Sequence, residues 1–158
     1  MKIREATVLD LEQLFTLEEE CFEHPFKKED ILRELSENPV AKYFVGVEGD
    51  ELVGFVNFWI TFDSATINQI CVTKSRRKCG FGGVLMNYAL KIAKDNECEF
   101  MTLEVRKSSI AAIALYEKCG FTLVTTKPQY YENGEDALYY VKGLIWYGQA
   151  SYYFRNWK

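Results

Sequence analysis

Residues 76–83 read Arg-Arg-Lys-Cys-Gly-Phe-Gly-Gly, between a predicted strand at about 65–72 and a predicted helix that opens at Gly80 to Gly83. Where a strand passes into a helix, the first backbone N–H groups of the helix lack partners and the helix dipole is positive. Gly80 and Gly82 carry no side chain that blocks close approach to the backbone, and three basic residues precede them. The stretch therefore predicts a binding site for a pyrophosphate group.

Three other interpretations fit this stretch less well. A bare Gly-x-Gly more often marks only a tight turn, but here a basic run and a helix accompany it. A Rossmann dinucleotide site belongs to the first turn of a repeated βαβ pattern, whereas this loop follows several predicted strands. A P-loop requires Gly-Lys followed by Ser or Thr, which is absent from the sequence.

The residues on either side predict alternating strands and helices. Strands are predicted at about 3–6, 43–47, 52–60, 65–72, 100–105, 121–126 and 137–141, and helices at about 11–21, 28–35, 80–95 and 109–118. Asp10 is the predicted N-cap of the first helix, and Asn133-Gly134 is the predicted turn between the last two strands. This order predicts one α/β domain with a mixed sheet.

Composition and charge narrow the classes of protein. The 158 residues suffice for one domain, and no apolar run approaches the roughly eighteen residues that a membrane span requires. Met1 to Glu5 lacks the layout of a secretory signal, which predicts a cytoplasmic protein. The net charge of −4 argues against nucleic-acid binding. The five scattered cysteines and single histidine, His24, predict reduced thiols and no metal site.

Two blocks of sequence resemble a known family. Arg77 to Gly82 resembles the [Arg/Gln]-x-x-Gly-x-[Gly/Ala] signature of the GNAT acetyltransferases. Further motifs resemble the RimI branch, the ribosomal-protein N-terminal-alanine acetyltransferases; these are Leu103–Arg106, Ala111–Phe121, Tyr130-Tyr131 and Glu135–Ala137. The resemblance implies the GNAT acyl-CoA N-acyltransferase fold over residues 1–142, a mostly antiparallel sheet with a splayed central strand pair flanked by helices. Residues 143–158 would form an aromatic extension packed on the same domain.

The resemblance also implies acetyl-CoA as the cosubstrate, with no metal. Backbone groups of the strand at 70–72 would pair with the pantetheine amides, and the glycine loop would hold the pyrophosphate. Ser109 stands where RimI-type enzymes carry an asparagine that contacts the cofactor. The residues expected at the cofactor are Ile70, Cys71, Val72, Arg77, Lys78, Cys79, Gly80, Phe81, Gly82, Gly83, Ser109 and Tyr116.

Two residues match the catalytic pair of this branch. Glu104 would act as the general base, through water, and Tyr116 as the general acid that protonates the coenzyme A thiolate. Attack by the amine would then be direct, without an acyl-enzyme. From periodicity alone, Glu104 is a surface residue and Tyr116 a core residue, and the resemblance reverses both assignments. Cys71, Cys79 and Cys119 are interpreted as small buried residues, because no histidine base is near them in sequence.

Four residues are expected at the acceptor. Pro25, Phe26, Tyr130 and Tyr131 match the two loops that flank the acceptor peptide, although local loop packing explains each equally well. An α-amine, with a pKa of about 8, loses its proton more easily than lysine, at about 10.4, which favours a protein N-terminus such as that of a ribosomal protein. Acetylation of a small amine or of lysine, and a non-catalytic coenzyme A-binding module, stay open, as does the oligomeric state.

Overall fold

The computed structural model describes residues 1–145 and contains one seven-stranded sheet in the order β1-β2-β3-β4-β5-β7-β6. The strands are β1 (Lys2–Glu5), β2 (Ala41–Glu48), β3 (Glu51–Thr61), β4 (Ser64–Val72), β5 (Phe100–Arg106), β6 (Thr122–Lys127) and β7 (Ala137–Gly143). The α-helices are α1 (Leu11–Cys21), α2 (Lys28–Ser36), α3 (Phe81–Asp95) and α4 (Ile110–Lys118), and 3-10 turns lie at Val8–Asp10 and Lys74–Arg76. The predicted order of elements and the α/β class are confirmed.

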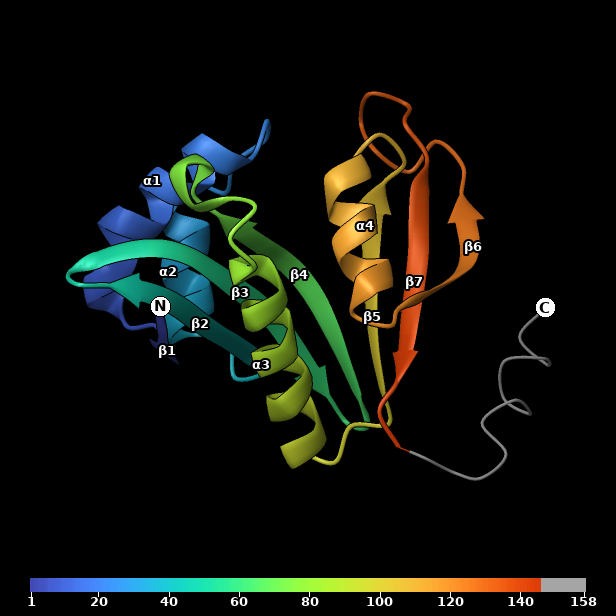
Figure 1. Ribbon diagram of the computed structural model, residues 1–158, viewed down its shortest axis with the longest axis horizontal. Coiled ribbons are helices and arrows are strands. Elements are labelled where there is room, and N and C mark those ends of the chain that lie inside the picture. The colour runs from blue at the N-terminus through green and yellow to red at the C-terminus, as the bar shows by residue number, and fades with distance from the viewer. Residues whose placement is uncertain (146–158) are drawn as a thin grey trace.

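The sheet is antiparallel except where β4 meets β5. These two strands pair in parallel from Ser64 opposite Phe100 to Ile67 opposite Leu103, and their pairing stops there. Figure 1 shows the two parts of the sheet meeting at the lower ends of β4 and β5 and separating toward the upper ends. The splayed central pair that the resemblance implied is therefore confirmed. It leaves one edge of β4, from Asn68 onward, facing a gap in the sheet.

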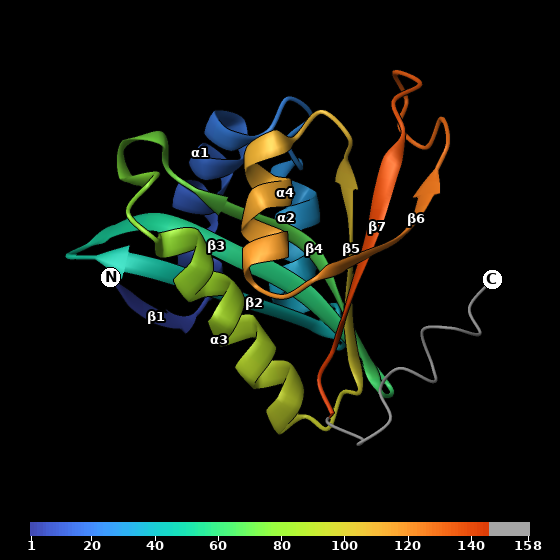
Figure 2. The same ribbon diagram turned by 45° about the vertical axis from the view of Figure 1, so that its right-hand side comes forward.

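Helices cover both faces of the sheet. In Figure 2, α3 and α4 lie in front of it and α1 and α2 lie behind it. β3 shows the consequence, because its residues 52–58 are all buried and form a nearly continuous apolar run, interrupted by Gly54 and Asn57. A strand buried on both faces loses the alternation of apolar and polar residues that marks a half-exposed strand. Val56 and Phe58 pack toward α3, whereas Phe55 packs toward α1 and α2.

Asp10 is the N-cap residue of α1, as predicted, but its side chain makes no capping hydrogen bond to that helix. A 3-10 turn precedes the helix, and the Thr7 Oγ1 accepts a hydrogen bond from the Leu9 amide at 3.3 Å. The Asp10 carboxylate points back instead, accepting from both Arg4 Nη atoms and from the Thr7 amide, each at 2.8 Å. The Arg4 guanidinium is the main reason that the pKa of Asp10 lies below its ordinary value.

The described part of the chain ends three residues beyond residue 142, where the sequence analysis expects the domain boundary. Gly143 is the last residue of β7, and the Leu144 amide donates to the Glu99 carbonyl at 2.8 Å. The aromatic residues expected to pack on the domain, from Trp146 to Trp157, lie outside the described residues. Within residues 1–145, no helix combines the length and the apolar character needed to cross a membrane.

Gly54 is a position where the fold tolerates no side chain. A Cβ atom built there would lie 2.6 Å from the Cys71 carbonyl oxygen of β4 and 3.1 Å from Leu85 of α3. We expect Gly54→Ala to lower the free energy of unfolding by about 1–3 kcal/mol, because backbone must move. Gly143→Ala is the matched control, since nothing lies within 4 Å of a Cβ there. Urea denaturation of both variants measures the difference, and equal stabilities would contradict this packing.

Candidate active site

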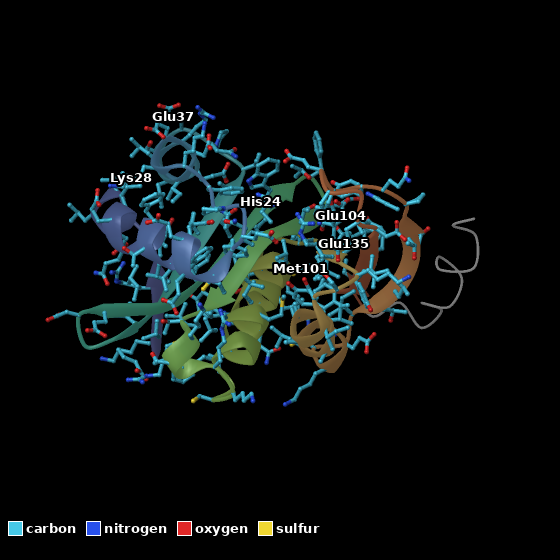
Figure 3. The ribbon with its side chains drawn as sticks, turned by 90° about the horizontal axis from the view of Figure 1, so that it is seen from above. His24, Lys28, Glu37, Met101, Glu104 and Glu135 are labelled. Atoms are coloured by element: carbon cyan, nitrogen blue, oxygen red, sulfur yellow. The ribbon has the colours of Figure 1, made fainter. Side chains whose placement is uncertain are left out.

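A cavity of about 580 Å³ opens where β4 and β5 separate. Its lining brings together Phe26 from the α1–α2 connection, Glu104 from β5, and Tyr130 and Tyr131 from the β6–β7 connection. Viewed from above in Figure 3, Glu104 and Glu135 lie on the β5–β7 side and His24 on the side of α1 and α2. Three chain segments thus meet at one opening.

Glu104 points into this cavity because β5 alternates. Leu103 and Val105 are buried against the α3 and α4 side, so Glu104 faces the opposite side. Its carboxylate forms an ion pair with Lys127, the last residue of β6. Interaction with this carboxylate is also the main reason that the pKa of Tyr130 is raised to about 12. Glu104 is therefore a partly exposed carboxylate in a cavity, with its own cation beside it.

Tyr116 lies on the other side of β5. It is the buried residue of α4, in edge-to-face contact with Phe121 at a centroid distance of 6.2 Å. Burial is the main cause that raises its pKa well above the ordinary value, and the neighbouring Tyr131 adds to the rise. Tyr116 does not line the cavity with Glu104.

The glycine loop has the geometry of an anion site. Gly80 has a φ of +82° at the start of α3, and the first α-helical bond runs from the Val84 amide to the Gly80 carbonyl at 3.2 Å. The amides of residues 81–83 therefore precede the helical ladder. A Cβ atom at Gly80 or Gly83 would meet nothing within 4 Å, whereas one at Gly82 would lie 3.1 Å from Leu115 of α4. Gly82 thus also permits α3 and α4 to approach.

The basic residues of this loop have different partners. Arg76 is paired with Glu48 at 2.7 Å, and Arg77 donates from Nε to the Val72 carbonyl at 3.1 Å. Arg77 thereby ties the loop to the end of β4. The Lys78 side chain is exposed, and its backbone has a φ of +61°. Of the three, Arg76 is the one whose charge is already neutralised by a carboxylate.

The open edge of β4 completes the geometry. Ile70, Cys71 and Val72 pair with Val56, Phe55 and Gly54 of β3 on one side. On the side of β5, their pairing has ended at Ile67. This edge therefore has no strand partner at residues 70–72, and the Val72 carbonyl accepts instead from Arg77 Nε at 3.1 Å and from Cys21 Sγ at 3.6 Å.

Comparison with known proteins places this geometry in a family. The model of the acetyltransferase (GNAT) family matches residues 11–121. The chain belongs to the GNAT acetyltransferase family.

Individual relatives agree with this assignment. A Bacillus subtilis protein, provisionally named a [ribosomal protein bS18]-alanine N-acetyltransferase, is 33% identical over 86% of this chain and 91% of its own. An N-alpha-acetyltransferase of Sulfolobus acidocaldarius is 31% identical over 86% of this chain and 88% of its own. The crystal structure of the ribosomal-protein-S18-alanine N-acetyltransferase from Escherichia coli has a TM-score of 0.84 at 24% identity, covering 94% and 97% of the two chains. The chain is thus an N-acetyltransferase of the GNAT fold.

Some expected GNAT site residues lie apart from the cavity. Pro25 is exposed and does not line it, unlike its neighbour Phe26. Ser109 precedes α4 but makes no capping hydrogen bond through its side chain. Cys79 is exposed and Cys119 is half-buried, so of the three cysteines interpreted as buried only Cys71 is. Cys79 lies in the connection between β4 and α3, where residues 74–80 are all exposed.

A polar network in this GNAT cavity was not found from the sequence. Glu34 of α2 accepts hydrogen bonds from Trp59 Nε1 at 2.7 Å and from Asn57 Nδ2 at 3.4 Å. Asn57 Oδ1 accepts in turn from Asn68 Nδ2 at 3.1 Å. Asn57 could have indicated this network from the sequence, because it is a polar side chain within the apolar run of β3. Lys127 was also missed, because nothing local in β6 indicates a partner on β5.

Glu18 links the α1–α2 connection to β4. This carboxylate is fully buried, and its Oε2 accepts from the Phe26 amide and from Gln69 Nε2, each at 3.1 Å. Its other oxygen, Oε1, has no hydrogen-bond partner among residues 1–145. Burial is the main cause that raises the pKa of Glu18, and the two hydrogen bonds oppose the rise.

We expect this raised pKa to make the folded protein less stable as pH increases. Between the unfolded value, about 4.3, and the raised folded value of Glu18, the folded state binds more protons than the unfolded state. The free energy of unfolding therefore falls as pH rises through that window, and Glu18→Gln removes this contribution. Urea denaturation at pH 5 and pH 8 measures the change, with the exposed Glu19→Gln as control. If the free energy of unfolding fell equally from pH 5 to pH 8 in wild type and in Glu18→Gln, the result would contradict a raised pKa of Glu18.

Proposed function

We propose that this N-acetyltransferase transfers the acetyl group of acetyl-CoA to the α-amine of a protein N-terminus, with an N-terminal alanine of a ribosomal protein as the leading candidate. The observation that supports this most directly is the cavity that joins Glu104 to Phe26, Tyr130 and Tyr131 at the gap between β4 and β5. The names of the relatives from Bacillus subtilis and Sulfolobus acidocaldarius point to the same kind of acceptor.

The described residues fit acetyl-CoA, which GNAT enzymes use as acyl donor. The amides of residues 81–83 and the exposed Lys78 suit a pyrophosphate, because unpaired N–H groups and a cation favour an anion. The edge of β4 at residues 70–72, which has no strand partner on the side of β5, suits the amides of an extended pantetheine chain. When bound, this cosubstrate supplies an acetyl thioester. Arg77 contributes by holding the loop against the end of β4.

In this proposal, two side chains move the protons. Glu104 accepts the proton that the amine loses, directly or through one water, since its carboxylate is partly exposed within the cavity. Tyr116 keeps its proton at neutral pH, because its pKa is raised, and donates it to the departing thiolate. The two residues lie on opposite faces of β5.

The cavity favours an α-amine on a peptide over other amines. A volume of about 580 Å³ is in the range of small-ligand sites and accepts the first residues of a chain. The aromatic walls, with Phe26 on one side and Tyr130 and Tyr131 on the other, suit an extended peptide. A lower pKa makes the α-amine some two to three units easier to deprotonate than lysine.

The proposed function is tested by thiol release from acetyl-CoA with three acceptors. One is a peptide with a free N-terminal alanine, the second is the same peptide with a blocked N-terminus and one lysine, and the third is a polyamine. We expect kcat/KM for the first to exceed the others by at least about 100-fold. If the enzyme turned over the polyamine or the lysine peptide faster, that amine and not the α-amine would be its acceptor.

A further inference from the structure

Lys127 stands where an acceptor amine is expected to bind. Its ammonium forms the ion pair with Glu104, and it lies 4.8 Å from the ring centroid of Tyr139 and 5.5 Å from that of Tyr130. All four residues line the same cavity. A carboxylate with two aromatic faces is a typical environment for a primary ammonium, because both the charge and the ring quadrupoles attract it.

We propose that Glu104, Tyr130 and Tyr139 form a subsite for a primary ammonium, and that Lys127 occupies it until an acceptor N-terminus displaces it. This inference rests on the proposed function, which assigns the acceptor amine to Glu104. The acceptor then arrives as an ammonium, takes the contacts that Lys127 gives up, and loses its proton only after binding. Lys127 is a built-in competitor for the acceptor, with no part in the proton transfers.

The structure allows the displacement that this requires. The side chain of Lys127 is 40% exposed and that of Glu104 is 27% exposed, so the ion pair is in contact with solvent. Ion pairs of this kind are weak, and two like charges cannot share one carboxylate without repulsion. Lys127 is also the last residue of the edge strand β6, and the 128–136 connection follows it. Its side chain can therefore turn outward without breaking the sheet.

Two substitutions of Lys127 test whether its ammonium competes with the acceptor or supports acceptor binding. Lys127→Met keeps the apolar stem but lacks the ammonium, whereas Lys127→Arg keeps a cation beside Glu104. We expect Lys127→Met to lower KM for the N-terminal alanine peptide about 3- to 5-fold, with KM for acetyl-CoA unchanged, because the competing pair is worth up to about 1 kcal/mol. Lys127→Arg should keep KM for the peptide at or above the wild-type value.

Calorimetry with coenzyme A present measures peptide binding independently of turnover. Lys127→Met should bind the free-amine peptide more tightly than wild type, and should bind the same peptide with an acetylated N-terminus no more tightly. An unchanged or raised KM in Lys127→Met, a fall in kcat alone, or equal gains for both peptides would overturn the inference. If wild type turns over no N-terminal peptide at all, the proposed function fails. If wild type does turn over the N-terminal peptide and Lys127→Met has the same KM for it, only the inference about Lys127 fails.

Discussion

Glu104→Gln is expected to lower kcat for acetyl transfer by about 100- to 10,000-fold, the usual contribution of a general base. Glutamine has the same shape but cannot accept the proton from the amine. Because Glu104 lines the cavity between β4 and β5 and not the glycine loop, KM for acetyl-CoA should change little. Initial rates of thiol release against both substrates measure the effect.

The matched control is Glu132→Gln, which removes an exposed carboxylate from the same side of the molecule without touching the cavity. It should retain wild-type rates. Glu104→Gln also removes the partner of Lys127, but that pair is partly exposed, so the thermal midpoint should hold within a few degrees. A Glu104→Gln enzyme that is folded and turns over at the wild-type rate would exclude Glu104 as the base.

The glycine loop and the individual strands were predictable because their signals are local. The basic run, Gly80 and the helix after it follow one another in sequence, and only glycine readily adopts the φ of +82° found there. Alternation along β5 was enough to place Glu104 on the face opposite Leu103 and Val105. These features depend on neighbours within a few residues, so the order of residues determines them.

Features that depend on distant pairing were not predictable. The ion pair of Glu104 joins residues 23 positions apart, and the hydrogen bond from Gln69 to Glu18 spans 51. Glu18 looks like one of several exposed acidic residues at the end of α1, and only the fold shows that it is buried beneath Phe26. The separation of Tyr116 from Glu104 by β5 was equally hidden. The resemblance supplied their roles but not their positions relative to each other.

Tyr116→Phe is expected to lower kcat by about 100-fold or more, with KM for acetyl-CoA within about threefold of wild type. The variant removes only the hydroxyl, which has no hydrogen-bond partner among the side chains of residues 1–145, so the edge-to-face contact with Phe121 and the packing of α4 are kept. Without a donor, the thiolate must leave unprotonated or take its proton from water. Initial rates against both substrates give the result.

The control for this variant is Tyr88→Phe on α3, which removes a hydroxyl from another tyrosine packed against the same core cluster. The ring centroids of Tyr88 and Phe44 are 5.0 Å apart.

Because the pKa of Tyr116 is raised, its hydroxyl stays protonated beyond pH 10. Any fall in wild-type kcat with increasing pH below pH 10 therefore belongs to another group. Turnover within threefold of wild type in Tyr116→Phe would return this residue to a packing role and leave water as the proton donor. A large loss would show that the phenol acts across β5 from Glu104, which requires the thioester to lie in the gap that the splayed strands leave between them.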